Sequence, residues 1–170
     1  MAGGIQIGTT ASSPSSKILD KQLKDLSLKL AKRYPGYHPG HSKHCMIFEG
    51  VETGCVPDGG VWFDEDSKVR VAFEAKYQGD HGNAHERQSK NYLICDSFKG
   101  KTFKYITFMS GLGARPNGVL DKFAKTMLNC RNSEGNRDLN VLNPEGLSFF
   151  MSVEGFTDEQ IQSIMEQALV

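Results

Sequence analysis

The sequence predicts an α/β fold in which a central mixed β-sheet is flanked by helices. Segments with apolar residues at helical spacing alternate along the chain with segments of strand character, which is the order expected for a sheet covered on both faces. The chain has 170 residues, of which 38% are hydrophobic, and this length suits one buried core. We therefore expect a single domain over residues 17–170. A disordered tail rich in Gly, Ser and Thr is expected over residues 1–16.

The first predicted element is an amphipathic helix over residues 17–34. Its apolar residues fall largely at three- and four-residue spacing among lysines, and Pro35 ends it. Residues 36–45 combine glycine, proline and histidine and are predicted to form a loop. Residues 46–48 are expected to form a short strand.

A β-hairpin is predicted next. Its strands cover residues 61–63 and 69–74, and an acidic turn at residues 64–67 joins them. Side chains alternate between the two faces of a strand, so an apolar set from Val69 to Ala75 occupies one face. Glu74 and Lys76 therefore point to the same, opposite face.

The second half of the chain continues the alternation of helices and strands. Thr157 is predicted to be the N-cap of the final helix, because Glu159 and Gln160 follow in its first turn. The expected elements are a helix over residues 85–98, a strand over 104–109, a helix over 118–129, a strand over 147–153 and a helix that ends at Leu169.

Two short stretches carry the clearest chemistry, Pro57-Asp58-Gly59-Gly60 and Glu74-Ala75-Lys76. In a hairpin, an Asp at the start of one strand can lie beside a Glu-x-Lys on its partner. Two carboxylates and the Ala75 carbonyl can hold Mg²⁺ while leaving positions for water and a substrate phosphate. Lys76 can orient the water and stabilise the charge that develops during phosphodiester hydrolysis. Acidic and basic residues also alternate on many exposed strands, so an ordinary surface strand is the competing interpretation.

Charge is unevenly distributed, although 20 basic and 20 acidic side chains leave the chain with no net charge. Residues 68–137 carry 13 basic and 6 acidic side chains, whereas residues 51–67 carry 5 acidic and no basic ones. A basic segment next to an acidic cluster fits a phosphate-binding surface beside a metal site, and solvated surface charge is the alternative. The neutral average therefore does not exclude a nucleic-acid partner.

Three stretches match a known family: Pro57-Asp58-Gly59-Gly60, Glu74-Ala75-Lys76-Tyr77-Gln78-Gly79 and Gly82-Asn83-Ala84-His85-Glu86-Arg87-Gln88-Ser89-Lys90-Asn91. They closely resemble EcoRI-type (EcoRI/MunI-like) type II restriction endonucleases, which belong to the PD-(D/E)xK nuclease superfamily. The resemblance implies a homodimeric endonuclease with the restriction-endonuclease-like core, which requires Mg²⁺, replaceable by Mn²⁺, and acts on double-stranded DNA. It implies that Asp58 and Glu74 ligate the metal, that Lys76 is the catalytic lysine, and that Gln78 supports them.

The third stretch corresponds to the family's DNA-reading segment, an extended chain that runs into the N-terminus of a helix in the major groove. Asn can bond adenine, Glu can accept from a base amino group, and Ala can contact a thymine methyl group. The same stretch fits a helix cap with Asn83 as N-cap and Glu86 in a capping box, and both interpretations can hold. The residues implied to contact DNA are Gly82, Asn83, Ala84, Glu86 and Arg87 at the bases, and Lys90 and Asn91 at the phosphates.

The sequence departs from the family pattern at one place. Only Asp80 and His81 separate Gly79 from Gly82, where larger members carry a long insertion that contacts the outermost base pair. We therefore expect a short palindromic site, AATT without fixed flanking bases. We also expect cleavage on the 5′ side of the first A, which leaves 5′ overhangs.

The histidines of the expected loop and the cysteines have competing interpretations. Imidazole and thiolate can bind zinc, but a stable structural site usually needs two separated ligand pairs, so a polar loop that contacts phosphate through His41 or Lys43 is preferred. The residues concerned are His38, His41, His44 and Cys45. The four cysteines are too scattered for a disulfide scaffold and are expected to be reduced, mostly buried thiols: Cys45, Cys55, Cys95 and Cys130.

Compartment and partners follow from what the sequence lacks and from the resemblance. The chain has no apolar run near the ~20 residues needed to span a bilayer and no secretory start, so a soluble, cytoplasmic protein is expected, without a membrane partner. A DNA methyltransferase of the same system is expected to protect the host genome without direct contact. Two other classes remain open: a structure-specific nuclease of the junction-resolvase type, and a sequence-specific DNA-binding protein without catalysis.

Overall fold

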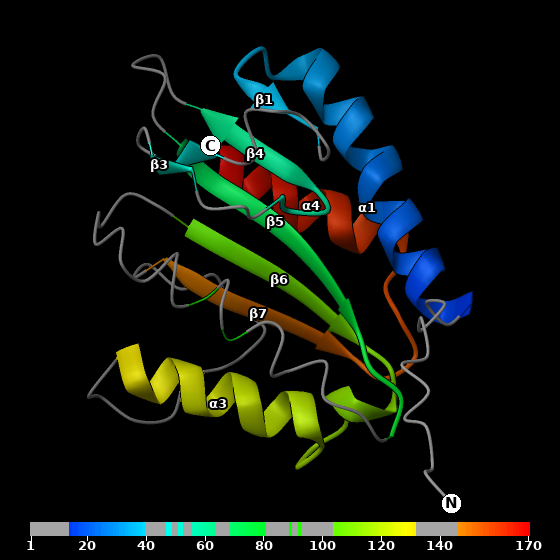
Figure 1. The fold of residues 1–170 in the computed structure, drawn as a ribbon. Helices are drawn as coiled ribbons and strands as arrows, with labels where there is room; N and C mark the ends of the chain where they lie inside the picture. The colour runs from blue at the N-terminus through cyan, green and yellow to red at the C-terminus, as the bar shows by residue number, and fades with distance from the viewer. Residues whose placement is uncertain are drawn as a thin grey trace, which may run out of the picture.

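A five-stranded mixed β-sheet is the centre of the molecule (Figure 1). A computed structural model describes residues 14–39, 47–48, 51–52, 56–63, 69–80, 89, 92, 104–131 and 146–170. In chain order, the elements are α1 (Pro14–Arg33), β1 (Tyr37–His38), β2 (Ile47–Phe48), β3 (Val51–Glu52), β4 (Gly60–Phe63), β5 (Val69–Tyr77), β6 (Lys104–Ser110), the 3-10 helix η2 (Leu112–Ala114), α3 (Val119–Arg131), β7 (Leu147–Ser152) and α4 (Asp158–Leu169). The α/β class predicted from the sequence is thus confirmed.

The sheet has the strand order β1-β4-β5-β6-β7. The first two pairings are antiparallel, and those of β5 with β6 and of β6 with β7 are parallel. The predicted hairpin is confirmed as β4 and β5, in which Gly60 pairs with Phe73. The acidic turn at residues 64–67 lies outside the described residues.

Helix α1 begins at Pro14, three residues before the expected start, so the last residues of the expected tail are helical. Proline is well suited to the first turn of a helix, because its missing N–H would have no partner there. The buried stripe of α1 has four- and three-residue spacing and consists of Leu19, Leu23, Leu26 and Leu30.

The expectation of a loop over residues 36–45 is wrong at its start. Tyr37 and His38 form β1, which pairs with Trp62 and Val61 of β4. Tyr37 is only 3% exposed, and burial of its large side chain favours the strand despite the neighbouring glycine and proline. The short strand expected at residues 46–48 is found as β2, which pairs with β3.

Two apolar layers cover the two faces of the sheet. Helices α1 and α4 lie on one face and α3 on the other (Figure 1). Alternation along β5 assigns the layers as predicted: Val71, Phe73 and Ala75 pack with α1 and α4, while Ala72 packs on the α3 side. Residues 74 and 76 therefore belong to the α3 face.

The remaining predicted elements are confirmed as β6, α3, β7 and α4. The capping box of α4 is present: the Gln160 N–H donates to Thr157 Oγ1 at 3.2 Å, and the Thr157 N–H donates to Gln160 Oε1 at 2.9 Å. Of the predicted helix at 85–98, only Ser89 and Tyr92 are described, and both are helical. Tyr92 is buried on the α3 face, where its hydroxyl donates to Thr107 Oγ1 at 3.0 Å.

Candidate active site

The candidate site lies where β5 extends beyond the start of β4. Strand β4 begins at Gly60, opposite Phe73, and the preceding turn continues along the same edge of β5. The Gly60 N–H closes this turn by donating to Pro57 O at 3.0 Å, and the Gly59 N–H donates to Phe73 O at 2.9 Å. The turn therefore brings Asp58 alongside Ala75.

Asp58 and Glu74 are held together by two reciprocal hydrogen bonds. The Asp58 N–H donates to Glu74 Oε2, and the Ala75 N–H donates to Asp58 Oδ2, both at 3.2 Å. Glu74 is only 6% exposed, and Asp58 is partly buried. Backbone donors thus orient both carboxylates at one point of the strand edge.

The Ala75 carbonyl points to the same edge as the two carboxylates. In a β-strand, the N–H and C=O of one residue point the same way, and the Ala75 N–H points to Asp58. The adjoining bonds agree, because Phe73 O faces the turn while the Gln78 N–H donates to Ser110 O on the β6 side. Lys76 is half-buried and shares the face of Glu74.

This donor set fits a hard divalent cation such as Mg²⁺. It offers two carboxylates and one carbonyl, all oxygen, which is the ligand type that Mg²⁺ prefers. Among the described residues, no three His, Cys, Asp or Glu side chains are grouped closely enough to hold a metal ion. An ion held by Asp58, Glu74 and the Ala75 carbonyl would therefore complete its coordination with water or substrate, as Mg²⁺ commonly does.

The turn that carries Asp58 is held against α1 by hydrogen bonds and close packing. The Ser27 hydroxyl lies 2.6 Å from Gly59 O and 2.6 Å from Leu23 O, and the Tyr37 hydroxyl also donates to Gly59 O. Gly59 has no side chain to separate the layers: a Cβ there would lie 2.8 Å from both Leu23 Cγ and Phe73 Cβ. The two glycines after Asp58 thus have a packing role and a turn role, since Gly60 adopts φ 83°.

Asp20 of α1 is an acidic neighbour of the site that the sequence did not reveal. Its pKa is raised from 3.8 to about 6, chiefly by partial loss of hydration and further by repulsion from Asp58, while Lys76 lowers it. Asp20 as a whole is exposed, as charged residues on a helix surface usually are. The sequence therefore gave no sign that Asp20 lies near the site. Only the packing of α1 against the hairpin brings it near the other charges.

Gln78 directly follows β5 and is buried beneath η2. Its carbonyl accepts from the Gly113 N–H at 3.1 Å, and a Cβ on Gly113 would lie 3.1 Å from its Cβ. Gly111, with φ 100°, would bring a Cβ to 2.1 Å from Gln78 O. The end of β5 is therefore clamped by a glycine-rich turn, consistent with a supporting place for Gln78.

The predicted DNA-contacting residues, Gly82, Asn83, Ala84, Glu86, Arg87, Lys90 and Asn91, lie outside the described residues. The described residues nearest to them are anchored on the α3 side. Asp80 Oδ1 lies 2.6 Å from Arg115 Nη2, and Tyr92 stacks on Phe123 with ring centroids 5.4 Å apart.

Of the suggested zinc ligands, only His38 is described. It lies in β1 and meets Phe63 edge to face, with ring centroids 5.0 Å apart. The others, His41, His44 and Cys45, lie outside the described residues, as does Lys43, and so do Cys55 and Cys95. Cys130 lies within α3, but its side chain is not described.

Comparisons of the chain with protein-family models, with curated proteins and with solved structures return no match. The helices among the described residues are all too short or too polar to cross a membrane.

Removing the Ser27 hydroxyl should loosen the Asp58 turn. Ser27→Ala leaves the buried Gly59 carbonyl with one partner fewer, so we expect the free energy of unfolding to fall by about 1–3 kcal/mol. Thr126→Ala is the matched control, because its hydroxyl donates to Lys122 O one turn back on the exposed surface of α3. Urea denaturation of both variants measures the difference, and equal stabilities would contradict the anchoring role.

The raised pKa of Asp20 predicts a pH dependence of stability. Between roughly pH 4 and 6 the folded chain keeps a proton that the unfolded chain has released, so stability is lost as pH rises through this window. Asp20→Asn should lose less stability than the wild type between pH 4 and pH 7.5, as measured by urea denaturation.

Asp25→Asn provides the control for this prediction. Asp25 lies on the same helix, is exposed and is 3.9 Å from Lys21 Nζ. We expect its variant to keep the wild-type pH profile. A wild-type profile in Asp20→Asn as well would disprove the electrostatic assignment.

Proposed function

We propose that this protein is a divalent-metal-dependent endonuclease that hydrolyses phosphodiester bonds in double-stranded DNA. The observation that carries the proposal is the interlocked pair of Asp58 and Glu74 at a strand edge, with Lys76 next on the same face. This is the arrangement that the PD-(D/E)xK nucleases require, and the α/β sheet with helices on both faces is compatible with their core. The proposal places the chain with the EcoRI-type restriction endonucleases that its sequence resembles.

Each residue of the site has a defined part in the proposed reaction. Asp58 and Glu74, with the Ala75 carbonyl, would hold Mg²⁺ or Mn²⁺ at the strand edge. The bound ion supplies Lewis-acid stabilisation of the phosphoryl group. The Lys76 ammonium would donate to the attacking water and stabilise the charge that develops on the phosphoryl oxygens. The backbone bonds that orient both carboxylates reduce the reorganisation needed when DNA binds.

The proposed specificity rests on the segment at residues 82–91 and its surroundings. Its match to the family's DNA-reading segment supports recognition of an AATT core, and the two-residue link at 80–81 supports a site without fixed flanking bases. The basic excess of residues 68–137 supplies charge for phosphate contacts. A palindrome is read by two equivalent half-sites, so the proposed enzyme acts as a homodimer.

Cleavage of plasmid DNA in the presence of Mg²⁺ tests the activity. We expect discrete fragments with the wild type and a loss of at least about 100-fold in rate for Glu74→Gln and for Lys76→Ala. Glu159→Gln on α4 and Lys32→Ala at the end of α1 are matched controls, because both residues are exposed and neither belongs to the proposed site. Binding to specific sites without cleavage would instead support a non-catalytic DNA-binding protein, and preference for branched DNA a junction-resolving nuclease.

Sequencing of the fragment ends tests the specificity. We expect every cut at AATT, 5′ of the first A, with all bases equally frequent at the flanking positions. Asn83→Ala should weaken discrimination against other sites by about 1–3 kcal/mol, since it removes a bidentate contact to adenine. Fixed flanking bases would contradict the short site, and unchanged specificity in Asn83→Ala would contradict the assigned reading residue.

A further inference from the structure

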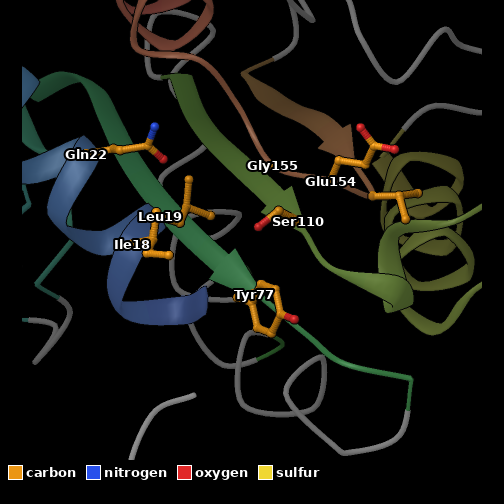
Figure 2. A pocket seen from close by; sticks show the side chains of 8 residues that line it. Ile18, Leu19, Gln22, Tyr77, Ser110, Glu154 and Gly155 are labelled. Atoms are coloured by element: carbon orange, nitrogen blue, oxygen red, sulfur yellow. The ribbon is translucent and has the colours of Figure 1, made fainter. Parts of the chain in front are cut away.

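Asp20 lies at the level of the candidate site, although it belongs to α1. The helix runs along β5 in the opposite direction, which two separate contacts establish. Leu23 packs against Gly59 and the middle of β5, while Leu19 lines a pocket of about 160 Å³ together with Tyr77 at the strand's end (Figure 2). Asp20 falls between Leu19 and Leu23, and hence opposite the part of β5 that contains Ala75.

The charge of Asp20 acts on the site from this position. The Asp58 carboxylate raises the pKa of Asp20 and the Lys76 ammonium lowers it, so both charges act on the Asp20 carboxyl. The firm attachment of α1 makes the arrangement rigid, since Ser27 and Tyr37 both bond the carbonyl of the residue after Asp58. Asp20 therefore adds a negative charge near Asp58 and Lys76.

We propose that Asp20 strengthens divalent-cation binding at Asp58 and Glu74 through its charge, without itself being a ligand. The inference rests on the proposed metal-dependent function. A direct ligand role is disfavoured because no three acidic side chains among the described residues are close enough to share an ion. Asp20 thus acts on the ion through space, by its charge.

An effect through space differs from ligation in size and in salt dependence. Removing one unit charge from the solvent-accessible surroundings of a divalent ion is expected to weaken binding roughly three- to tenfold at low salt. Mobile ions screen such an interaction, so the difference should shrink towards unity near 1 M salt, where the Debye length is about 3 Å. Loss of a direct ligand would weaken binding far more at every salt concentration.

The test uses Mn²⁺ alone, without DNA, and measures its dissociation constant at pH 8 by electron paramagnetic resonance. The full-length protein is compared with Asp20→Asn, Asp20→Glu, Asp25→Asn and Asp58→Asn, in 20 mM and in 1 M KCl. Asp25→Asn controls for loss of one negative charge elsewhere on α1, and Asp58→Asn reports the ligand site. Asp20→Glu keeps the charge and should bind as the wild type does.

The proposal requires weaker Mn²⁺ binding by Asp20→Asn at low salt, little difference at high salt, and wild-type behaviour of Asp25→Asn. Wild-type affinity in Asp20→Asn, with binding lost in Asp58→Asn, would overturn the role of Asp20 and leave the proposed function standing. Binding lost equally in Asp20→Asn and Asp58→Asn would show that Asp20 is a ligand and overturn the through-space role. Absence of Mn²⁺ binding by the wild type would overturn this inference together with the metal-dependent function.

Discussion

The close contact between α1 and the Gly59 turn is the constraint on which the rest of the site depends. Because residue 59 lacks a side chain, Leu23 can reach the backbone of the turn and the side of Phe73. Ser27 and Tyr37 then satisfy the Gly59 carbonyl, which would otherwise be buried at a free-energy cost. The position of the neighbouring Asp58 therefore follows from helix packing as much as from the hairpin.

The site combines a local pair with a distant neighbour. Glu74 lies on β5 and Asp58 in the turn that leads into β4, so their mutual geometry is set by the strand register and two backbone hydrogen bonds. Asp20 reaches the same edge only after the helix has docked. The docking of α1 on the sheet therefore links the electrostatics of the proposed metal site to the apolar core between the helix and the sheet.

Local patterns predicted much of the fold and the carboxylate pair, because two-residue alternation and hairpin pairing are short-range properties. They assigned Glu74 and Lys76 to one face. They also identified Thr157 as the N-cap of α4, and the structure contains its capping box. The short strand β1 was missed because its strand character comes from burial of Tyr37 against Phe73, which depends on tertiary packing. Asp20 was missed for the same reason: an exposed aspartate on a lysine-rich helix has no local mark that distinguishes it from Asp25.

The offset between β4 and β5 also bears on how the sheet edge is protected from the addition of a further strand. A strand edge with unpaired backbone groups is a template on which another chain can add a strand, and proteins commonly protect such edges with charge. In the part of β5 that extends past the start of β4, the strand edge faces the Asp58 side chain. This carboxylate accepts a hydrogen bond from the Ala75 N–H, a donor that an incoming strand would need. The Asp58 carboxylate, which is proposed to hold a metal, thus also occupies a backbone donor, so this part of the β5 edge is closed to β-sheet extension.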